Sequence, residues 1–207
     1  MIWKPQFTPD EVLIVDDQQS YSGYSTVRQL SIQYPLFQGG MSVPIFREVV
    51  FRPNAVAVLL YDPDRCKVVM IEQFRAPALF EKENPWLLEI VAGLVEEAEN
   101  PEETATREVW EETGCKILSL ISIGAYLTTP GTLAEKIFLY CGRIHAPDNG
   151  GIQGIAEEGE NIKVHVISRD DIFQLLADGG IISSPALIAI QWLKLNYASL
   201  HFPLHAE

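Results

Sequence analysis

The segment that most constrains this chain is residues 93–115, which read GLVEEAENPEETATREVWEETGC. Asn100 is a good N-cap, Pro101 suits the first helical position, and Glu103 stands where a capping box places an acid. Gly114 is a typical residue just past the end of a helix. These signals predict a helix of about three turns over residues 101–113, with a defined start and a defined end.

This predicted helix carries an unusual group of acids. Glu108, Glu111 and Glu112 occupy positions i, i+3 and i+4, so their side chains project from one side of the helix. Like charges at this spacing repel, and a divalent cation between them turns repulsion into attraction. Oxygen ligands favour Mg²⁺ or Mn²⁺ over zinc. Arg107 lies one turn before Glu111 and is expected to orient it by a bidentate contact. The alternative is a solvated acidic helix face.

The rest of the chain alternates between strand and helix patterns. Residues 55–61 form an apolar run typical of a buried central strand, and a turn at residues 62–64 joins it to a second strand at 67–74, which predicts a β-hairpin. Further patterns predict strands within residues 21–34, 85–95, 118–127, 135–144 and 163–167, helices at 169–177 and 184–199, and a long loop at 145–160. Strands mixed with few helices indicate an α/β/α sandwich.

Composition excludes several classes of protein. The formal net charge of −13 argues against general nucleic-acid binding, which needs a basic surface. The three cysteines, Cys66, Cys115 and Cys141, lack the spacing of a zinc site or a disulfide framework, and a cytoplasmic setting is expected. No apolar run of about 18 residues or signal-peptide pattern is seen, so no membrane association is expected.

Residues 93–115 match the spacing G-x5-E-x7-R-E-U-x-E-E-x-G-U, in which U is apolar. On this match the chain resembles the Nudix hydrolase superfamily. The whole chain is similar to its bacterial ADP-ribose pyrophosphatases, through NPWLLEIVAGLVEEAE, which leads into residues 93–115 (the Nudix box, or box), Pro130 fifteen residues after Cys115, and GIAEEGENIKVHVIS. The resemblance implies a Nudix-type α/β/α sandwich with a mixed sheet at residues 46–207. It also implies a small antiparallel β lobe at residues 1–45, swapped between the subunits of a homodimer.

The resemblance also implies the metal site and the catalytic groups. Glu108 and Glu112 would be the main ligands of Mg²⁺ or Mn²⁺, with the backbone carbonyl of Ala92, while Glu160 would reach the metals from the loop. Glu111 would hold or support a further ion, and both it and Arg107 are expected to be catalytic. Glu158 would be the general base, with Glu157 and Glu160 left open as alternatives.

For substrate binding, the resemblance implies that Arg75 holds the diphosphate and that Glu135 accepts hydrogen bonds from the terminal ribose. Arg47 and Tyr24 match positions that contact the adenosine half from the swapped lobe, and Gly93 and Leu94 are expected beside the substrate. The chain has Ala134 where the relatives often carry Ser before the residue that matches Glu135.

The expected reaction is metal-dependent hydrolysis of ADP-ribose to AMP and ribose 5-phosphate. An anionic substrate and an acidic chain need a cation between them, which the predicted ligands would hold. Three alternatives stay open: a Nudix hydrolase for other nucleotide sugars such as GDP-mannose, a sensor that binds a nucleotide sugar without cleaving it, and a purely structural dimer module.

Overall fold

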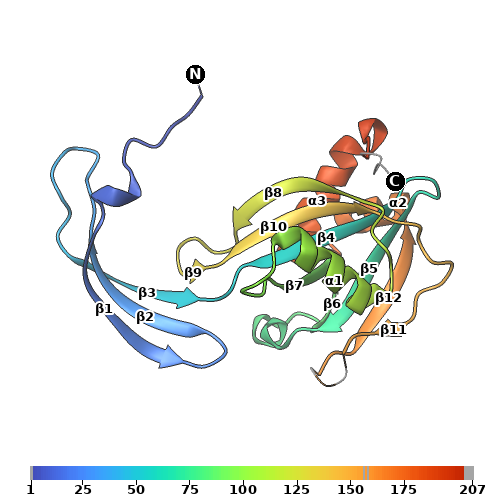
Figure 1. Ribbon diagram of the computed structural model, residues 1–207, viewed down its shortest axis with the longest axis horizontal. Helices are drawn as coiled ribbons and strands as arrows, with labels where there is room; N and C mark the ends of the chain where they lie inside the picture. Colours follow the sequence, from blue (N-terminus) through green and yellow to red (C-terminus); the bar gives the residue numbers. More distant parts are fainter. Residues whose placement is uncertain (1, 156, 158, 203–207) are drawn as a thin grey trace. The chain divides into compact units, whose positions relative to one another are not determined.

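The computed structural model describes residues 2–155, 157 and 159–202 (Figure 1). The chain divides into two compact units. The first contains the chain up to Pro53 together with Leu127–Glu135, and the second contains Asn54–Tyr126 and the chain from Lys136 onward. The sequence-based prediction divides the chain after residue 45, where a strand begins at Ile45. No helix in the described part of the chain is long and apolar enough to cross a membrane.

The first unit is a four-stranded sheet in the order β1-β2-β3-β9. Its strands are β1 (Leu13–Ser22), β2 (Thr26–Gln33), β3 (Ile45–Phe51) and β9 (Leu133–Ala134). The first three pair antiparallel, and β9 pairs parallel to β3. A short 3-10 helix, η1 (Pro9–Glu11), precedes them. The antiparallel strands predicted within residues 21–34 are confirmed, although β1 begins eight residues before that segment.

The second unit is built on an eight-stranded mixed sheet. Its main order is β11-β12-β5-β4-β10-β8, with β6 paired to β5 and β7 paired to β4. The predicted hairpin is confirmed, because β4 and β5 pair antiparallel from Leu60 opposite Val69 to Asp62 opposite Lys67. Strand β10 pairs parallel to β4. The strands are β4 (Ala55–Asp62), β5 (Lys67–Phe74), β6 (Trp86–Glu89), β7 (Val91–Leu94), β8 (Ser119–Leu127), β10 (Lys136–Arg143), β11 (Ile152–Gln153) and β12 (Ile162–Ser168).

Helices cover both faces of this sheet (Figure 1). Every residue of β4 is buried, and successive side chains point to opposite faces. Val56 and Val58 pack in a core with Ala105 and Val109 of α1 (Pro101–Thr113). Ala57 and Leu59 share the other core with residues of α2 (Arg169–Ala177) and α3 (Ser184–Asn196). The predicted α/β/α sandwich is confirmed.

Helix α1 has the bounds that its capping signals predict. The Asn100 side chain accepts hydrogen bonds from the backbone N–H groups of Glu102 and Glu103, and the Glu103 carboxylate accepts one from the Asn100 N–H. Gly114 ends the helix with a φ of 67°, in the left-handed region. Helix α2 also matches its prediction, whereas the helix predicted over residues 184–199 stops at Asn196 and continues as the 3-10 helix η4 (Tyr197–Ser199).

Candidate active site

Glu112 lies on the buried side of α1, with a side chain that is almost fully enclosed. The backbone N–H of Ala92 in β7 donates to Glu112 Oε2 over 3.3 Å. Burial, and then the negative charge of Glu108, raises the pKa of Glu112 to about 9. The carboxyl on its own therefore favours its protonated form at neutral pH, because the site holds negative charge at a high cost.

Glu108 lies one turn earlier on α1 and packs against the backbone of β7. A Cβ atom at Gly93 would stand 1.9 Å from Glu108 Oε1, so no side chain fits there while Glu108 keeps this position. Burial raises the pKa of Glu108 and outweighs the opposing effect of Arg107. Steric contact therefore explains why glycine stands at the start of the box: Gly93 leaves room for the carboxylate of Glu108.

Arg107 joins the other box residues into one ionic network. Its Nε and Nη2 donate to the two oxygens of Glu99, over 2.9 and 3.0 Å. Its Nη1 donates to Glu108 Oε1 over 2.9 Å and to Glu111 Oε2 over 3.0 Å. The bidentate partner is thus Glu99, and the contact predicted with Glu111 is a single hydrogen bond. Hydrogen bonds from Arg107 and then from Thr104 lower the pKa of Glu99 to about 2.

Glu99 belongs to this ionic network, although no role was predicted for it from the sequence. The signal for it was present, because the box spacing separates Glu99 from Arg107 by a fixed eight residues. Arg107 Nη2 also lies 3.5 Å from the carbonyl oxygen of Leu94. The network therefore ties the loop before α1 to the end of β7, and it fixes two of the three helix carboxylates.

Glu160 reaches the carboxylate group from the loop before β12. Its Oε2 accepts a hydrogen bond from the backbone N–H of Ile155 over 3.0 Å, and its charge raises the pKa of both Glu108 and Glu112. The predicted general base, Glu158, lies outside the described residues. Glu157 is described and exposed. The choice between these three loop acids therefore stays a prediction.

The carboxylates of this site fit a divalent cation by their chemistry. Glu108, Glu112 and Glu160 offer only oxygen atoms, and their mutual repulsion is what a cation would relieve. Among the described residues, no three acidic, histidine or cysteine side chains form a ready-made cage for a metal. Mg²⁺ does not need one, because it keeps several waters and commonly binds through one or two carboxylates.

Arg75 lies just after β5 and forms an ion pair that sequence reasoning missed. Its Nε donates to Glu89 Oε2 in β6 over 2.7 Å, and the Glu89 residue is 9% exposed. The charge of Arg75 lowers the pKa of Glu112, against the larger effect of burial. The structure thus places this predicted diphosphate ligand within electrostatic range of the helix carboxylates. The signal for Glu89 was a single acid in the apolar run WLLEIVAG.

The remaining predicted substrate residues belong to the first unit. Glu135 is buried, accepts a hydrogen bond from Thr128 over 3.3 Å and lies 3.6 Å from Arg52 Nε. The Arg52 guanidinium stacks on the ring of the exposed Tyr24 at 5.3 Å. Arg52, which sequence reasoning missed, therefore links Glu135 to Tyr24. Arg47 is exposed and donates to the carbonyl of Phe46.

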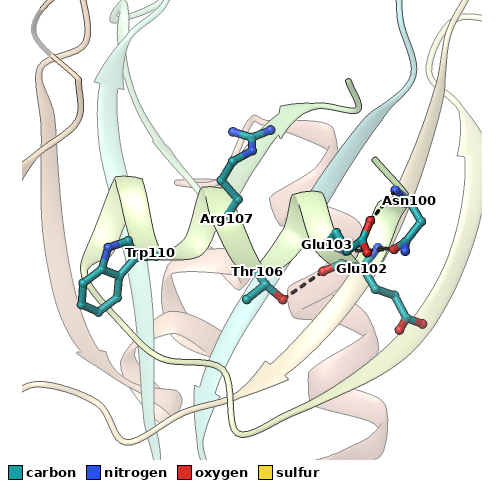
Figure 2. A pocket seen from close by; sticks show the side chains of 6 residues that line it. All are labelled: Asn100, Glu102, Glu103, Thr106, Arg107 and Trp110. Atoms are coloured by element: carbon teal, nitrogen blue, oxygen red, sulfur yellow. Dashed lines mark hydrogen bonds between the residues drawn. The ribbon is translucent and has the colours of Figure 1, made fainter. Parts of the chain in front are cut away.

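A shallow hollow of about 590 Å³ lies on the solvent side of α1 (Figure 2). Figure 2 shows the Arg107 side chain leaving the helix on the side opposite to Thr106. The hollow is lined by Asn100, Glu102, Glu103, Thr106, Arg107 and Trp110. The buried carboxylates of Glu108 and Glu112 do not line it.

The sequence is similar to those of known proteins over most of its length. The NUDIX domain family model matches residues 51–187. The chain is 39% identical over 197 residues to an ADP-ribose pyrophosphatase of Haemophilus influenzae, covering 94% of this chain and 91% of the relative. It is 37% identical over 194 residues to an ADP-ribose pyrophosphatase of Escherichia coli K12, covering 94% and 93%. A GDP-mannose pyrophosphatase of Yersinia pestis is 32% identical over 164 residues, or 79% of each chain.

Proposed function

The chain belongs to the NUDIX domain family, and from that premise we propose that it hydrolyses the diphosphate linkage of ADP-ribose to AMP and ribose 5-phosphate. The observation that carries this proposal is Glu112, a buried carboxyl whose pKa is raised to about 9 beside Glu108 and Glu160. Such a group is costly to keep and indicates a site prepared for positive charge. The similarity to two ADP-ribose pyrophosphatases over 94% of the chain supports the choice of substrate.

Mg²⁺, or Mn²⁺ in its place, is the proposed cofactor. Glu108 and Glu112 would hold it with Glu160 and the Ala92 carbonyl, and Glu111 would support a further ion. When bound, such ions neutralise diphosphate oxygens and lower the pKa of a coordinated water. Arg107 contributes by fixing the carboxylates of Glu108 and Glu111 before substrate arrives. The proposed base that takes the proton of the attacking water is Glu158, with Glu157 or Glu160 as alternatives.

The proposed substrate contacts involve residues outside the carboxylate group of α1. Arg75 would bind the diphosphate, and Gly93 and Leu94 at the end of β7 would lie beside it. Glu135 would accept hydrogen bonds from the terminal ribose, and Arg47 and Tyr24 would contact the adenosine half. The Arg52 contacts with Glu135 and Tyr24 support this assignment, because they hold the first in place and stack on the second.

We also propose that two copies of the chain form a homodimer with a swapped N-terminal lobe. The exposed apolar side chains of the first unit support this, among them Leu13, Val15 and Phe46.

A cytoplasmic location is proposed from the three cysteines, which are all unpaired.

A substrate comparison tests the proposed function. The purified protein is incubated with Mg²⁺ and, separately, ADP-ribose, GDP-mannose and NADH, and the products are separated by chromatography. ADP-ribose should yield AMP. Loss of a group behind a metal ligand costs about 10- to 100-fold, so Glu112→Gln, which removes a ligand, should lose more than about 100-fold. Glu102→Gln, an exposed acid on the same helix, is the matched control and should retain activity.

The relative named GDP-mannose pyrophosphatase supplies the second candidate substrate. A strong preference for GDP-mannose would leave the carboxylate site intact but would contradict the roles given to Glu135 and Tyr24. If none of the three substrates is cleaved with Mg²⁺ or Mn²⁺, a sensor that binds a nucleotide sugar without cleaving it becomes the favoured function.

A further inference from the structure

We infer that Glu89 is a positioning residue that holds the Arg75 guanidinium ready for the diphosphate of the substrate. This inference rests on the proposed function, in which Arg75 binds that diphosphate. It assigns a role to a buried acid that lies outside the box and outside the group of carboxylates on α1.

The strand register places Glu89 on the face of the sheet that α1 covers. Glu89 of β6 stands opposite Ile71 of β5. Ile71 packs in the same core as Ala105 and Val109 of α1. Directly opposed residues of an antiparallel pair share a face, so the Glu89 side chain lies on this side too. It is therefore on the side of the sheet from which Glu108 and Glu112 face β7.

The side chains of Glu89 and Arg75 are buried to different degrees, which indicates that the more buried one, Glu89, holds the other in position. The side chain of Glu89 is 12% exposed and that of Arg75 is 42% exposed. A carboxylate enclosed to this degree needs a partner, and Arg75 Nε supplies one at 2.7 Å. Glu89 is thus the fixed end of the pair, and Arg75 extends from it toward solvent.

The geometry of the contact leaves the other donors of Arg75 available. A guanidinium carries five N–H donors, and the two terminal nitrogens hold four of them. Among the described residues, Glu89 is the one side-chain hydrogen-bond partner of Arg75, and it engages Nε. The two terminal nitrogens form the planar fork that suits phosphate oxygens. A long side chain held at Nε also loses less conformational freedom when substrate binds.

A double-mutant cycle tests this role in the full-length protein. KM and kcat for ADP-ribose are measured with Mg²⁺ for Glu89→Ala, Arg75→Ala and the double variant. A hydrogen bond to a charged group is lost, so Glu89→Ala should raise KM about tenfold, while kcat changes less than about threefold. Starting from Arg75→Ala, the further change Glu89→Ala should alter KM less than about twofold, because the group that Glu89 positions is already gone.

Two variants serve as controls. Glu89→Gln keeps an oxygen that accepts from Nε, so its KM should stay within about threefold of the wild type. Glu72→Gln removes an acid from β5 that pairs with His165 and Lys163, and both kinetic constants should be unchanged. If Glu89→Ala does not fold, Glu89→Asp tests the same bond, because it keeps the charge, leaves Arg75 unchanged and withdraws the acceptor from Nε by one methylene group; KM should again rise, and Glu89→Gln should not show this rise.

Calorimetric binding of inorganic pyrophosphate, with Mg²⁺ present, repeats the cycle without catalysis. The role of Glu89 is overturned if Glu89→Ala weakens binding by the same factor with and without Arg75, if kcat alone falls, or if the wild type does not bind pyrophosphate. Failure of the wild type to cleave ADP-ribose, with pyrophosphate binding and its coupling intact, refutes the proposed function and leaves the role of Glu89 standing.

Discussion

At the scale of single residues, Glu112 shows how function is set against stability. The residue is 2% exposed, and its carboxyl receives one backbone hydrogen bond and faces the charges of Glu108 and Glu160. Burial and like charge both favour the protonated form. A proton and a divalent cation would therefore compete for the same group.

This competition predicts how stability depends on pH. The folded pKa of Glu112 is raised to about 9 from its ordinary value of 4.5, so the folded protein without metal holds this proton more tightly than the unfolded chain. The stability that this proton contributes is present below about pH 4.5 and is lost as pH rises toward 9. The thermal midpoint of metal-free protein should fall over this window, and the rise in midpoint on adding Mg²⁺ should grow.

Thermal unfolding of Glu112→Gln with and without Mg²⁺ checks this prediction. The neutral amide should flatten the pH dependence between about pH 5 and 9 and reduce the Mg²⁺ effect. Glu102→Gln should behave as the wild type. A Mg²⁺ effect that is equal at both ends of the pH range would contradict the raised pKa.

The sequence predicted which carboxylates share one side of α1, but it did not predict contacts between side chains that are far apart in the chain. The spacing within one helix is fixed, so Arg107, Glu108, Glu111 and Glu112 could be placed from sequence alone. The Arg75–Glu89 pair spans a hairpin with a long connection, and its formation depends on the register of β5 against β6. Arg52 reaches Tyr24 and Glu135 through pairings with strands far apart in sequence, so no local pattern predicted it.

At the scale of elements, α1 is specified by local signals at both ends, which explains why its predicted bounds are correct. The N-cap, the capping box and the left-handed glycine each satisfy backbone groups that the helix itself leaves free. β1 was harder to predict because all of its ten residues are exposed and its sequence lacks a buried alternating face. Its position is set by pairing with β2, which is an interaction between strands and is not encoded in the local sequence of β1.

The N-cap of α1 gives a prediction about stability. Asn100→Ala removes the acceptor of two backbone N–H groups and should lower the free energy of unfolding by about 1 kcal/mol. Ser183→Ala is a matched control, because Ser183 precedes α3 without a side-chain capping bond and should cost less than about 0.5 kcal/mol. Urea unfolding of both variants measures the difference. Equal losses in the two would show that the cap bonds of Asn100 contribute little.

At the scale of the whole molecule, the two units differ in how much they bury. The second unit has a core on each side of its sheet, and β4 is buried along its full length. In the first unit, β1 is exposed throughout and β2 buries one residue, Ser31. The first unit therefore has little apolar burial of its own in a single copy, which agrees with a proposed partner subunit.

Hydrogen exchange should separate the two units. Amides of β4 should be among the slowest in the chain, and those of β1 should exchange faster in dilute protein. If two copies associate through the first unit, exchange in β1 should slow as protein concentration rises, because association favours the protected form. The edge strand β8 of the second unit is the internal control and should not change. The proposed interface would be contradicted if exchange in β1 stayed constant over the protein concentrations at which the molecular mass in solution rises from one copy to two.

The full burial of β4 also has a consequence for insertions and deletions. Its odd-numbered and even-numbered residues serve different cores, Leu59 the one with α2 and α3, Val58 the one with α1. Adding or removing one residue in this strand would exchange the two sets of side chains beyond that point. Each set of side chains would then face the core that the other set fills, and β7, which carries Gly93 opposite Val56, would lose its register with β4. Length variation compatible with activity is therefore expected in the surface connections and not in β4.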